Sequence, residues 1–256
     1  MLTKIHWQLA ADFQNLEQWT KDLPSYFADH GRTIFKARNE VKVFEVGGME
    51  LVVKSFKVPN PVNRLAYVHF RKSKAARSFA NAHRLLKAGA ATPTPVAFVE
   101  RLANGLLADS YYITLNHPHD FTLREVLLNQ VGDKEHILAQ WVNFTYHQLY
   151  LNGIFHLDYS PGNTLIRRDQ GSCHFAVVDL NRMRFMTVGF DQGLRGFCQL
   201  SADANTLAFI ARTYAGLCNR PADQTVARLL QFDRRNNCRE QVRTRIKKWF
   251  RKRAAD

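Results

Sequence analysis

One short segment, GIFHLDYSPGNTLI at residues 153–166, restricts the possible folds of this chain more than any other feature. It contains Asp158 and Asn163, and the apolar run HFAVVDL that follows it carries Asp179. Phosphoryl transfer needs a carboxylate near the acceptor hydroxyl, an amide oxygen on a metal ion, and a second carboxylate between the metal and the phosphates. The segment therefore predicts a phosphoryl-transfer site built from one loop and the end of one strand.

The spacing H-x-D-x-x-x-x-N, formed by His156, Asp158 and Asn163, is that of a kinase catalytic loop. We expect Asp158 to orient or deprotonate the acceptor hydroxyl, and Asn163 and Asp179 to hold Mg²⁺. His156 is expected to be a buried hydrogen-bonding support of the loop rather than a base. A single Asp between apolar segments is more often a turn or cap residue, but the joint pattern favours the catalytic interpretation.

The order of secondary-structure signals predicts an α+β, two-lobed protein-kinase-like fold. Before His117-Pro118 the chain contains a helical pattern at 64–88 and five strand-like runs: 33–37, 41–46, 49–56, 95–101 and 110–115. After that point helices predominate. We therefore expect a small antiparallel β-sheet lobe at 1–116, a mainly helical lobe at 117–256, and nucleotide in the cleft between them. Residues 7–29 give no clear structural signal.

Lys54 lies in the apolar strand LVVKSF and is the predicted contact to the α- and β-phosphates of the nucleotide. Taken alone, it is more often an edge-strand lysine with its ammonium in water. Two features depart from ordinary protein kinases. The turn KARNEV has no glycine, so Arg38 and Asn39 are the candidate phosphate contacts there, with a solvated turn as an equal alternative. No acidic residue occurs at 51–99, so the acid that usually pairs with this lysine is missing; Ala80 stands near its place, and Asn81 is a candidate substitute.

The net charge of +14 predicts a polyanionic partner. Ten Lys and Arg residues and one acid lie between Arg234 and Arg253. There Val242, Ile246, Trp249 and Phe250 recur at helical spacing, which suits a basic helix at a membrane surface; packing of Trp249 and Phe250 on the helical lobe is a near-even alternative. Nucleic acid is not expected as a partner, because no groove-reading motif is present. The four cysteines form no C-x-x-C pair and predict free thiols.

Several segments together resemble the lipopolysaccharide kinase family (Kdo/WaaP type). These are GRTIFKARNEVKVFEVGGMELVVKSFK, RKSKAARSFANAHRLLKAGAATPTPV, GIFHLDYSPGNTLI and VVDLNRMRF, which cover most of residues 31–185. The resemblance implies ATP and Mg²⁺ as cofactors and an acceptor hydroxyl on Kdo or heptose of the lipopolysaccharide inner core. By motif match, it assigns the roles given above to Lys54, Asp158, Asn163 and Asp179.

The resemblance also implies a lipid-linked anionic glycan as acceptor, and a location at the cytoplasmic face of a bacterial inner membrane. The basic C-terminal segment would then attract the chain to the anionic surface. No obligate protein partner is expected. A second hypothesis is a catalytically weak or silent kinase-like fold that acts as a basic binding module for anionic lipid or glycan. The missing acidic partner of Lys54 and the glycine-free turn motivate it.

Overall fold

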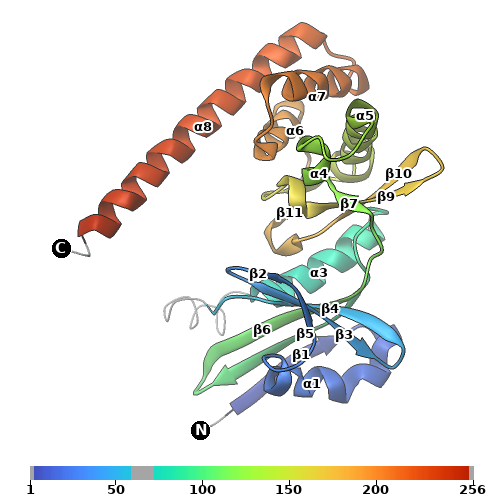
Figure 1. Cartoon of the computed structure of the whole chain (residues 1–256), viewed down its shortest axis with the longest axis vertical. Helices are drawn as coiled ribbons and strands as arrows, with labels where there is room; N and C mark the ends of the chain where they lie inside the picture. Colours follow the sequence, from blue (N-terminus) through green and yellow to red (C-terminus); the bar gives the residue numbers. More distant parts are fainter. Residues whose placement is uncertain (1–2, 59–71, 254–256) are drawn as a thin grey trace. The chain divides into compact units, whose positions relative to one another are not determined.

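The computed structural model describes residues 3–58 and 72–253, with side chains up to residue 238 (Figure 1). The chain forms two compact units. Unit 1 comprises residues 1–119 and 176–183, and unit 2 comprises residues 120–175 and 184–256. The predicted helical pattern at 64–71 and the apolar positions Val242, Ile246, Trp249 and Phe250 lie outside the described side chains.

Unit 1 is built on a six-stranded antiparallel sheet of order β1-β5-β6-β4-β3-β2. All five predicted strands are present. The prediction of five was wrong, because the sheet has a sixth strand, β1. Thr3–Leu9 (β1) pairs with β5 at the edge of the sheet. The remaining strands are Arg32–Lys36 (β2), Glu40–Val46 (β3), Met49–Ser55 (β4), Pro95–Ala103 (β5) and Leu106–Leu115 (β6).

Two tight turns set the register of this sheet. Gly47 and Gly48 both have positive φ, at 56° and 77°, and join β3 to β4. Asn104 and Gly105, with φ of 50° and 73°, join β5 to β6 in the same way. Positive φ at both central residues matches the right-handed twist of the flanking strands, and glycine and asparagine tolerate it best. Gly-Gly and Asn-Gly pairs between two strand-like runs are strong hairpin signals, so both turns are recognisable from the sequence.

Helices α1 (Glu17–Tyr26) and α3 (Lys74–Lys87) cover opposite faces of the sheet (Figure 1). Ala97 and Val99 of β5 belong to the apolar cluster that includes Leu23 of α1. Phe98, between them, points to the other face and contacts Phe79 of α3, with ring centroids 5.6 Å apart. This alternation is what a strand buried on both faces requires. The segment that precedes α1 is the 3-10 turn Ala11–Leu16 (η1).

Helix α3 has clear signals at both ends. Ser73 caps its N-terminus, with the side-chain oxygen accepting a hydrogen bond from the backbone N–H of Ala76 at 3.1 Å. At the other end Gly89 has φ of 77°, and the N–H of Ala90 donates to the carbonyl of Leu85. The C-terminal end of the predicted helical pattern, at residue 88, is confirmed to within one residue.

Unit 2 is mainly helical and includes two small sheets, β10-β9-β7 and β11-β8. Its longest helix, α8, has 32 residues, and its first turns pack on α6 and α7. All four cysteines are free, as predicted. The elements, in chain order, are Phe121–Thr122 (β7), Leu123–Leu127 (α4), Lys134–Phe144 (α5), the π-helical turn Thr145–Tyr150 (η2), Ile154–His156 (β8), Pro161–Asn163 (η3), Thr164–Asp169 (β9), Ser172–Val177 (β10, whose last two residues belong to unit 1), Leu180–Arg182 (η4, in unit 1), Met183–Phe185 (β11), Phe190–Phe197 (α6), Cys198–Leu200 (η5), Ala204–Leu217 (α7) and Ala222–Arg253 (α8).

Candidate active site

Lys54 forms an ion pair with Asp179 inside unit 1. Its Nζ lies 2.8 Å from Oδ1 of Asp179, and the two side chains are 20% and 23% exposed. Lys54 is near the end of β4, where it faces Tyr112 of β6, and its ammonium lies 5.4 Å from the ring centroid of Phe56. Its partial burial removes much of the solvent screening that weakens surface pairs. The alternative of an edge-strand lysine in open water is wrong, because β4 lies between β3 and β6.

Asp179 is held in an unusual backbone conformation by its surroundings. Its φ of 60° places it in the left-handed region, directly before the 3-10 turn η4. The amide of Asn181 donates to the same carboxylate oxygen. The amide of Asn81, on α3, donates to the carbonyl of Leu180 at 2.7 Å. The suggestion that Asn81 holds Lys54 is therefore wrong: Asn81 binds the backbone beside Asp179, and Asp179 itself pairs with Lys54.

The second set of predicted residues lies in one loop of unit 2. His156 is buried, and its Nδ1 accepts a hydrogen bond from the backbone N–H of Asp158 at 3.0 Å. The amide nitrogen of Asn163 donates to the carbonyl of Asp158 at 2.7 Å, and so does the N–H of Ser160, at 2.8 Å. These bonds fix the backbone on both sides of the half-buried Asp158. The geometry at His156 matches the expected support of the loop.

A residue that the sequence did not single out, Gln199 of η5, also binds this loop. Its Oε1 accepts a hydrogen bond from the N–H of Tyr159 at 2.7 Å, and its Nε2 donates to the carbonyl of His156 at 3.4 Å. The side-chain amide of Gln199 therefore binds the backbone on both sides of Asp158. No spacing rule links residue 199 to the loop, so only the folded structure reveals this contact.

Arg38 and Asn39, the predicted phosphate contacts of the β2–β3 turn, have different surroundings. Asn39 uses its side-chain oxygen to accept a hydrogen bond from the N–H of Lys57 at 3.2 Å, which is a turn-stabilising role. Arg38 is exposed, and its charge acts on Lys74 of α3. Burial lowers the pKa of Lys74, and the nearby charges of Arg38, Arg182 and Arg77 lower it further.

The donor atoms present fit Mg²⁺. This ion prefers oxygen and is usually held by one or two protein side chains together with substrate phosphates. Asp179 supplies a carboxylate, and Asn163 retains its amide oxygen because its nitrogen is engaged with Asp158. Among the described residues, no group of three or more His, Cys, Asp or Glu could hold a metal.

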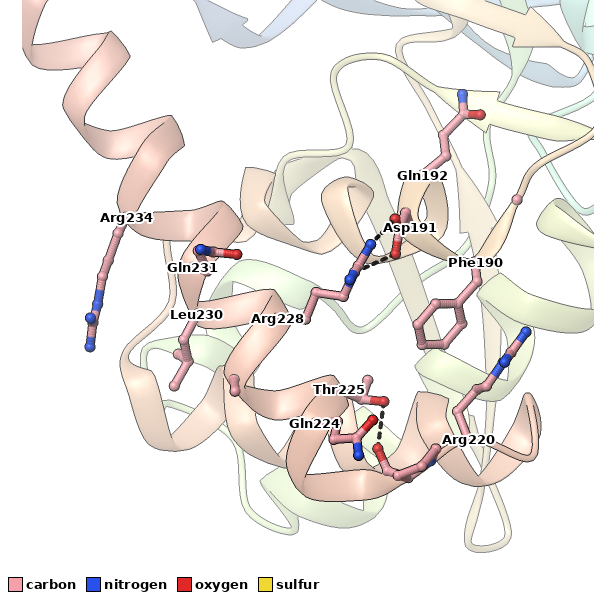
Figure 2. A pocket seen from close by; sticks show the side chains of 13 residues that line it. Phe190, Asp191, Gln192, Arg220, Gln224, Thr225, Arg228, Leu230, Gln231 and Arg234 are labelled. Atoms are coloured by element: carbon pink, nitrogen blue, oxygen red, sulfur yellow. Dashed lines mark hydrogen bonds and ion pairs between the residues drawn. The ribbon is translucent and has the colours of Figure 1, made fainter.

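Unit 2 also has a broad groove between the start of α6 and one side of α8 (Figure 2). Its volume is about 1230 Å³, and neither Asp158 nor Asn163 lines it. Arg228 of α8 forms two hydrogen bonds to the carboxylate of Asp191, on α6. The guanidinium of Arg220 lies 5.5 Å from the ring centroid of Phe190. Arg234 adds a third guanidinium and Asp191 is the acid of the lining, so the groove is net positive.

A sequence model of the lipopolysaccharide kinase (Kdo/WaaP) family matches residues 55–217. The chain belongs to this family. The matched part contains Asp158, Asn163 and Asp179 and begins directly after Lys54. Membership supports a lipopolysaccharide kinase, as the sequence predicted. It leaves the acceptor sugar open.

The solved structures that resemble this chain are distant from it in sequence. WaaP in complex with acyl carrier protein superimposes with a TM-score of 0.60 at 19% identity, covering 90% of this chain and 97% of that one. This likeness shows the fold and confirms the predicted kinase-like α+β architecture. Two structures of WbdD, one with the kinase inhibitor LY294002, match at TM-scores of 0.46, with 18% and 15% identity over 78% and 81% of this chain and 44% and 45% of theirs. Comparison with curated protein sequences gave no match.

Proposed function

We propose that this lipopolysaccharide kinase transfers the γ-phosphoryl group of ATP to a sugar hydroxyl, on Kdo or heptose, of the inner core. The observation that carries the proposal is the ion pair between Lys54 and Asp179, at 2.8 Å. In this pair, Lys54 is the cation expected to contact the α- and β-phosphates, and Asp179 is the carboxylate expected to bind the metal. An active kinase requires both groups to be in place.

The residues of the catalytic loop have separate roles in this proposal. Asp158 accepts the proton of the acceptor hydroxyl as the acceptor oxygen bonds to the γ-phosphorus. The bond from that phosphorus to the bridging oxygen breaks, and ADP leaves. Mg²⁺, bound by Asp179 and Asn163, would neutralise charge on the phosphates. His156 and Asn163 bind the backbone N–H and carbonyl of Asp158, which fixes the position from which its side chain extends.

The test is transfer of label from γ-labelled ATP to Kdo-lipid A or a heptosylated acceptor, with Mg²⁺ present. Asp158→Ala should lower the rate by at least about 100-fold, the lower end expected for general-base catalysis. Lys54→Met should also lower it by about 100-fold, because it removes a positive charge that stabilises the phosphates. Asp169→Ala is the matched control, because this carboxylate lies at the exposed turn between β9 and β10. Undiminished transfer by Asp158→Ala would contradict the assigned role. Absence of label on every acceptor would contradict the substrate class.

The acceptor that we propose is lipid-linked and anionic, so the chain would act at the inner face of the bacterial inner membrane. None of the described helices has the length and apolar character needed to cross a bilayer. Attraction of the basic C-terminal segment to anionic lipids would bring the chain to this surface. WaaP, with which this chain shares its fold, was solved with acyl carrier protein. We therefore propose a protein of that type as a further partner, which the sequence had not led us to expect.

A basic binding module without catalysis is the second candidate, and the positive groove of unit 2 favours it. Thermal unfolding with ATP and Mg²⁺ separates the two. Ligand at 100 times its Kd stabilises the folded state by about 2.7 kcal/mol. A rise of the midpoint that disappears in Lys54→Met supports the kinase. No rise with ATP, together with a rise on adding an anionic glycan, supports the binding module.

A further inference from the structure

The guanidinium group of Arg124 lies against the catalytic loop within unit 2. Arg124 is an exposed residue of α4. Gly162 belongs to η3 and stands in the sequence between Asp158 and Asn163. A Cβ built on Gly162 would lie 2.8 Å from a terminal nitrogen of Arg124 and 3.3 Å from its Cζ. Atoms in a packed protein do not approach so closely, so the guanidinium occupies the space that a side chain at position 162 would need.

The backbone at position 162 does not itself require glycine. Gly162 is not among the glycines with positive φ, the conformation that other residues rarely adopt. The three atoms nearest to its missing side chain all belong to the guanidinium of Arg124. The structural reason for glycine at this position is therefore the space that Arg124 takes. A side chain there would push the guanidinium away from the loop.

Neighbouring residues fix the backbone of Arg124 relative to this loop. Thr122 of β7 pairs with Leu165 of β9, the strand that directly follows η3. Thr122 also caps α4, because its hydroxyl accepts a hydrogen bond from the N–H of Arg124 at 3.2 Å. The N–H of Thr122 donates to the carboxylate of Glu125 at 2.9 Å, which completes a capping box. The base of the Arg124 side chain and the catalytic loop thus belong to one hydrogen-bonded part of unit 2.

The guanidinium of Arg124 is available to a ligand. Within residues 3–58 and 72–238 it forms no hydrogen bond or ion pair. The adjacent acid, Glu125, uses its carboxylate to accept bonds from Thr122 instead. A guanidinium binds the paired oxygens of a carboxylate or a phosphate with two parallel hydrogen bonds. An anionic group is therefore the ligand chemistry that suits Arg124.

We propose that Arg124 binds an anionic group of the acceptor glycan and so positions the acceptor hydroxyl for Asp158. The inference rests on the proposed function for its substrate. Kdo is a sugar acid and carries a carboxylate, whereas a heptose is anionic only where it bears a phosphate. Either group has the paired oxygens that Arg124 would bind. Gly162 keeps the loop clear of side-chain atoms, so that the guanidinium can lie across it.

The experiment measures phosphoryl transfer from ATP to Kdo-lipid A by the full chain, with each substrate varied in turn. Arg124→Met should raise KM for the acceptor about 10-fold, equivalent to about 1.4 kcal/mol. Its kcat and its KM for ATP should stay within about 2-fold, because a lost ground-state contact changes KM alone. Gly162→Ala should raise the acceptor KM in the same direction by displacing the guanidinium. The matched controls, which should leave it unchanged, are Arg167→Met, exposed on β9, and Gly132→Ala, where an added Cβ meets no atom within 4 Å.

Altered acceptors identify the anionic group that Arg124 binds. Reduction of the Kdo carboxylate to an alcohol, or removal of the phosphates, yields acceptors that each lack one kind of anion. If Arg124 binds the missing group, Arg124→Met weakens binding of the intact acceptor but has no further effect on the altered one. An effect of Arg124→Met that persists undiminished on both altered acceptors would overturn the inference.

Calorimetry with a soluble, deacylated Kdo glycan and no ATP separates this inference from the proposed reaction. Binding that depends on Arg124, without label transfer to any acceptor, would support the anion contact and contradict the kinase reaction. Label transfer by the unsubstituted chain, with an unchanged acceptor KM in Arg124→Met, would contradict the role of Arg124 and leave the reaction standing. A lower midpoint of thermal unfolding in Arg124→Met, with a normal acceptor KM, would instead assign Arg124 to the fold.

Discussion

At the scale of single residues, Lys42 shows how a buried charge can serve the fold alone. It is 4% exposed, and its ammonium donates to the carbonyls of Phe27, Ala28 and His30 at 2.7, 2.8 and 3.0 Å. These carbonyls follow the C-terminus of α1, where a cation also suits the helix dipole. All three protons of the ammonium are used. Lys54, by contrast, pairs with one carboxylate beside the candidate site.

Replacing Lys42 with Met should destabilise the protein by about 1–3 kcal/mol, because the substitution leaves partly buried carbonyls without their donor. Urea unfolding measures this free energy. Lys36→Met is the control: the Lys36 side chain is 72% exposed, and its loss should change stability by less than about 0.5 kcal/mol. Equal effects of the two substitutions would show that the three carbonyl bonds contribute nothing to stability.

At the scale of elements, close packing between α6 and its neighbours depends on two glycines. A Cβ added at Gly196 would collide with the hydroxyl of Tyr150, and one added at Gly193 would collide with that of Tyr214. The hydroxyl of Tyr150 donates to the carbonyl of Gly193 at 3.1 Å, so it cannot move away without losing this bond. The helix therefore approaches η2 and α7 closely because side chains are absent on this face.

Gly196→Ala should cost about 1–3 kcal/mol through overpacking. Gly216, at the end of α7, has nothing within 4 Å of an added Cβ. Gly216→Ala should leave stability unchanged or raise it by up to about 1 kcal/mol, because alanine has the higher helix propensity. Thermal or urea unfolding of both variants checks the difference, and the same sign for both would contradict the packing argument.

The contact between η5 and the catalytic loop gives a second prediction at this scale. Gln199→Ala removes both bonds that bracket Asp158. Because small misplacements of a reacting group can lower rates by up to about 100-fold, we expect kcat to fall about 10-fold or more with KM for ATP nearly unchanged. Gln224→Ala on α8 is the control. A change in KM alone would show that Gln199 does not position the loop.

At the scale of the whole molecule, the net charge of +14 should govern contact with membranes. The full chain should sediment with vesicles containing anionic phospholipid at 0.15 M salt and dissociate at 1 M, as the Debye length falls from about 8 to 3 Å. Neutral phosphatidylcholine vesicles provide the control. Binding that is insensitive to salt, or equal on neutral vesicles, would show that apolar insertion rather than charge holds the chain at the surface.

Much of the fold could be predicted because its signals are local. β-Branched and aromatic content identified the strands of the first unit, and the Gly47-Gly48 and Asn104-Gly105 pairs are the local signals of its hairpins. Strand β1 was missed because its partner, β5, lies more than eighty residues away, so no hairpin turn in the sequence indicates the pairing. The resemblance of several motifs to the lipopolysaccharide kinases correctly predicted the family.

The sequence alone determined the family, five of the six strands of the first unit, and the candidate residues Lys54, Asp158, Asn163 and Asp179. The strands and the candidate residues follow from local composition and motif spacing, and the family follows from the resemblance of several motifs to known members. Only the tertiary structure decided which groups meet: Lys54 with Asp179, and Gln199 with the catalytic loop. The physical reason is that each contact joins residues distant along the chain, and packing of whole elements, rather than local preference, brings their side chains within bonding distance.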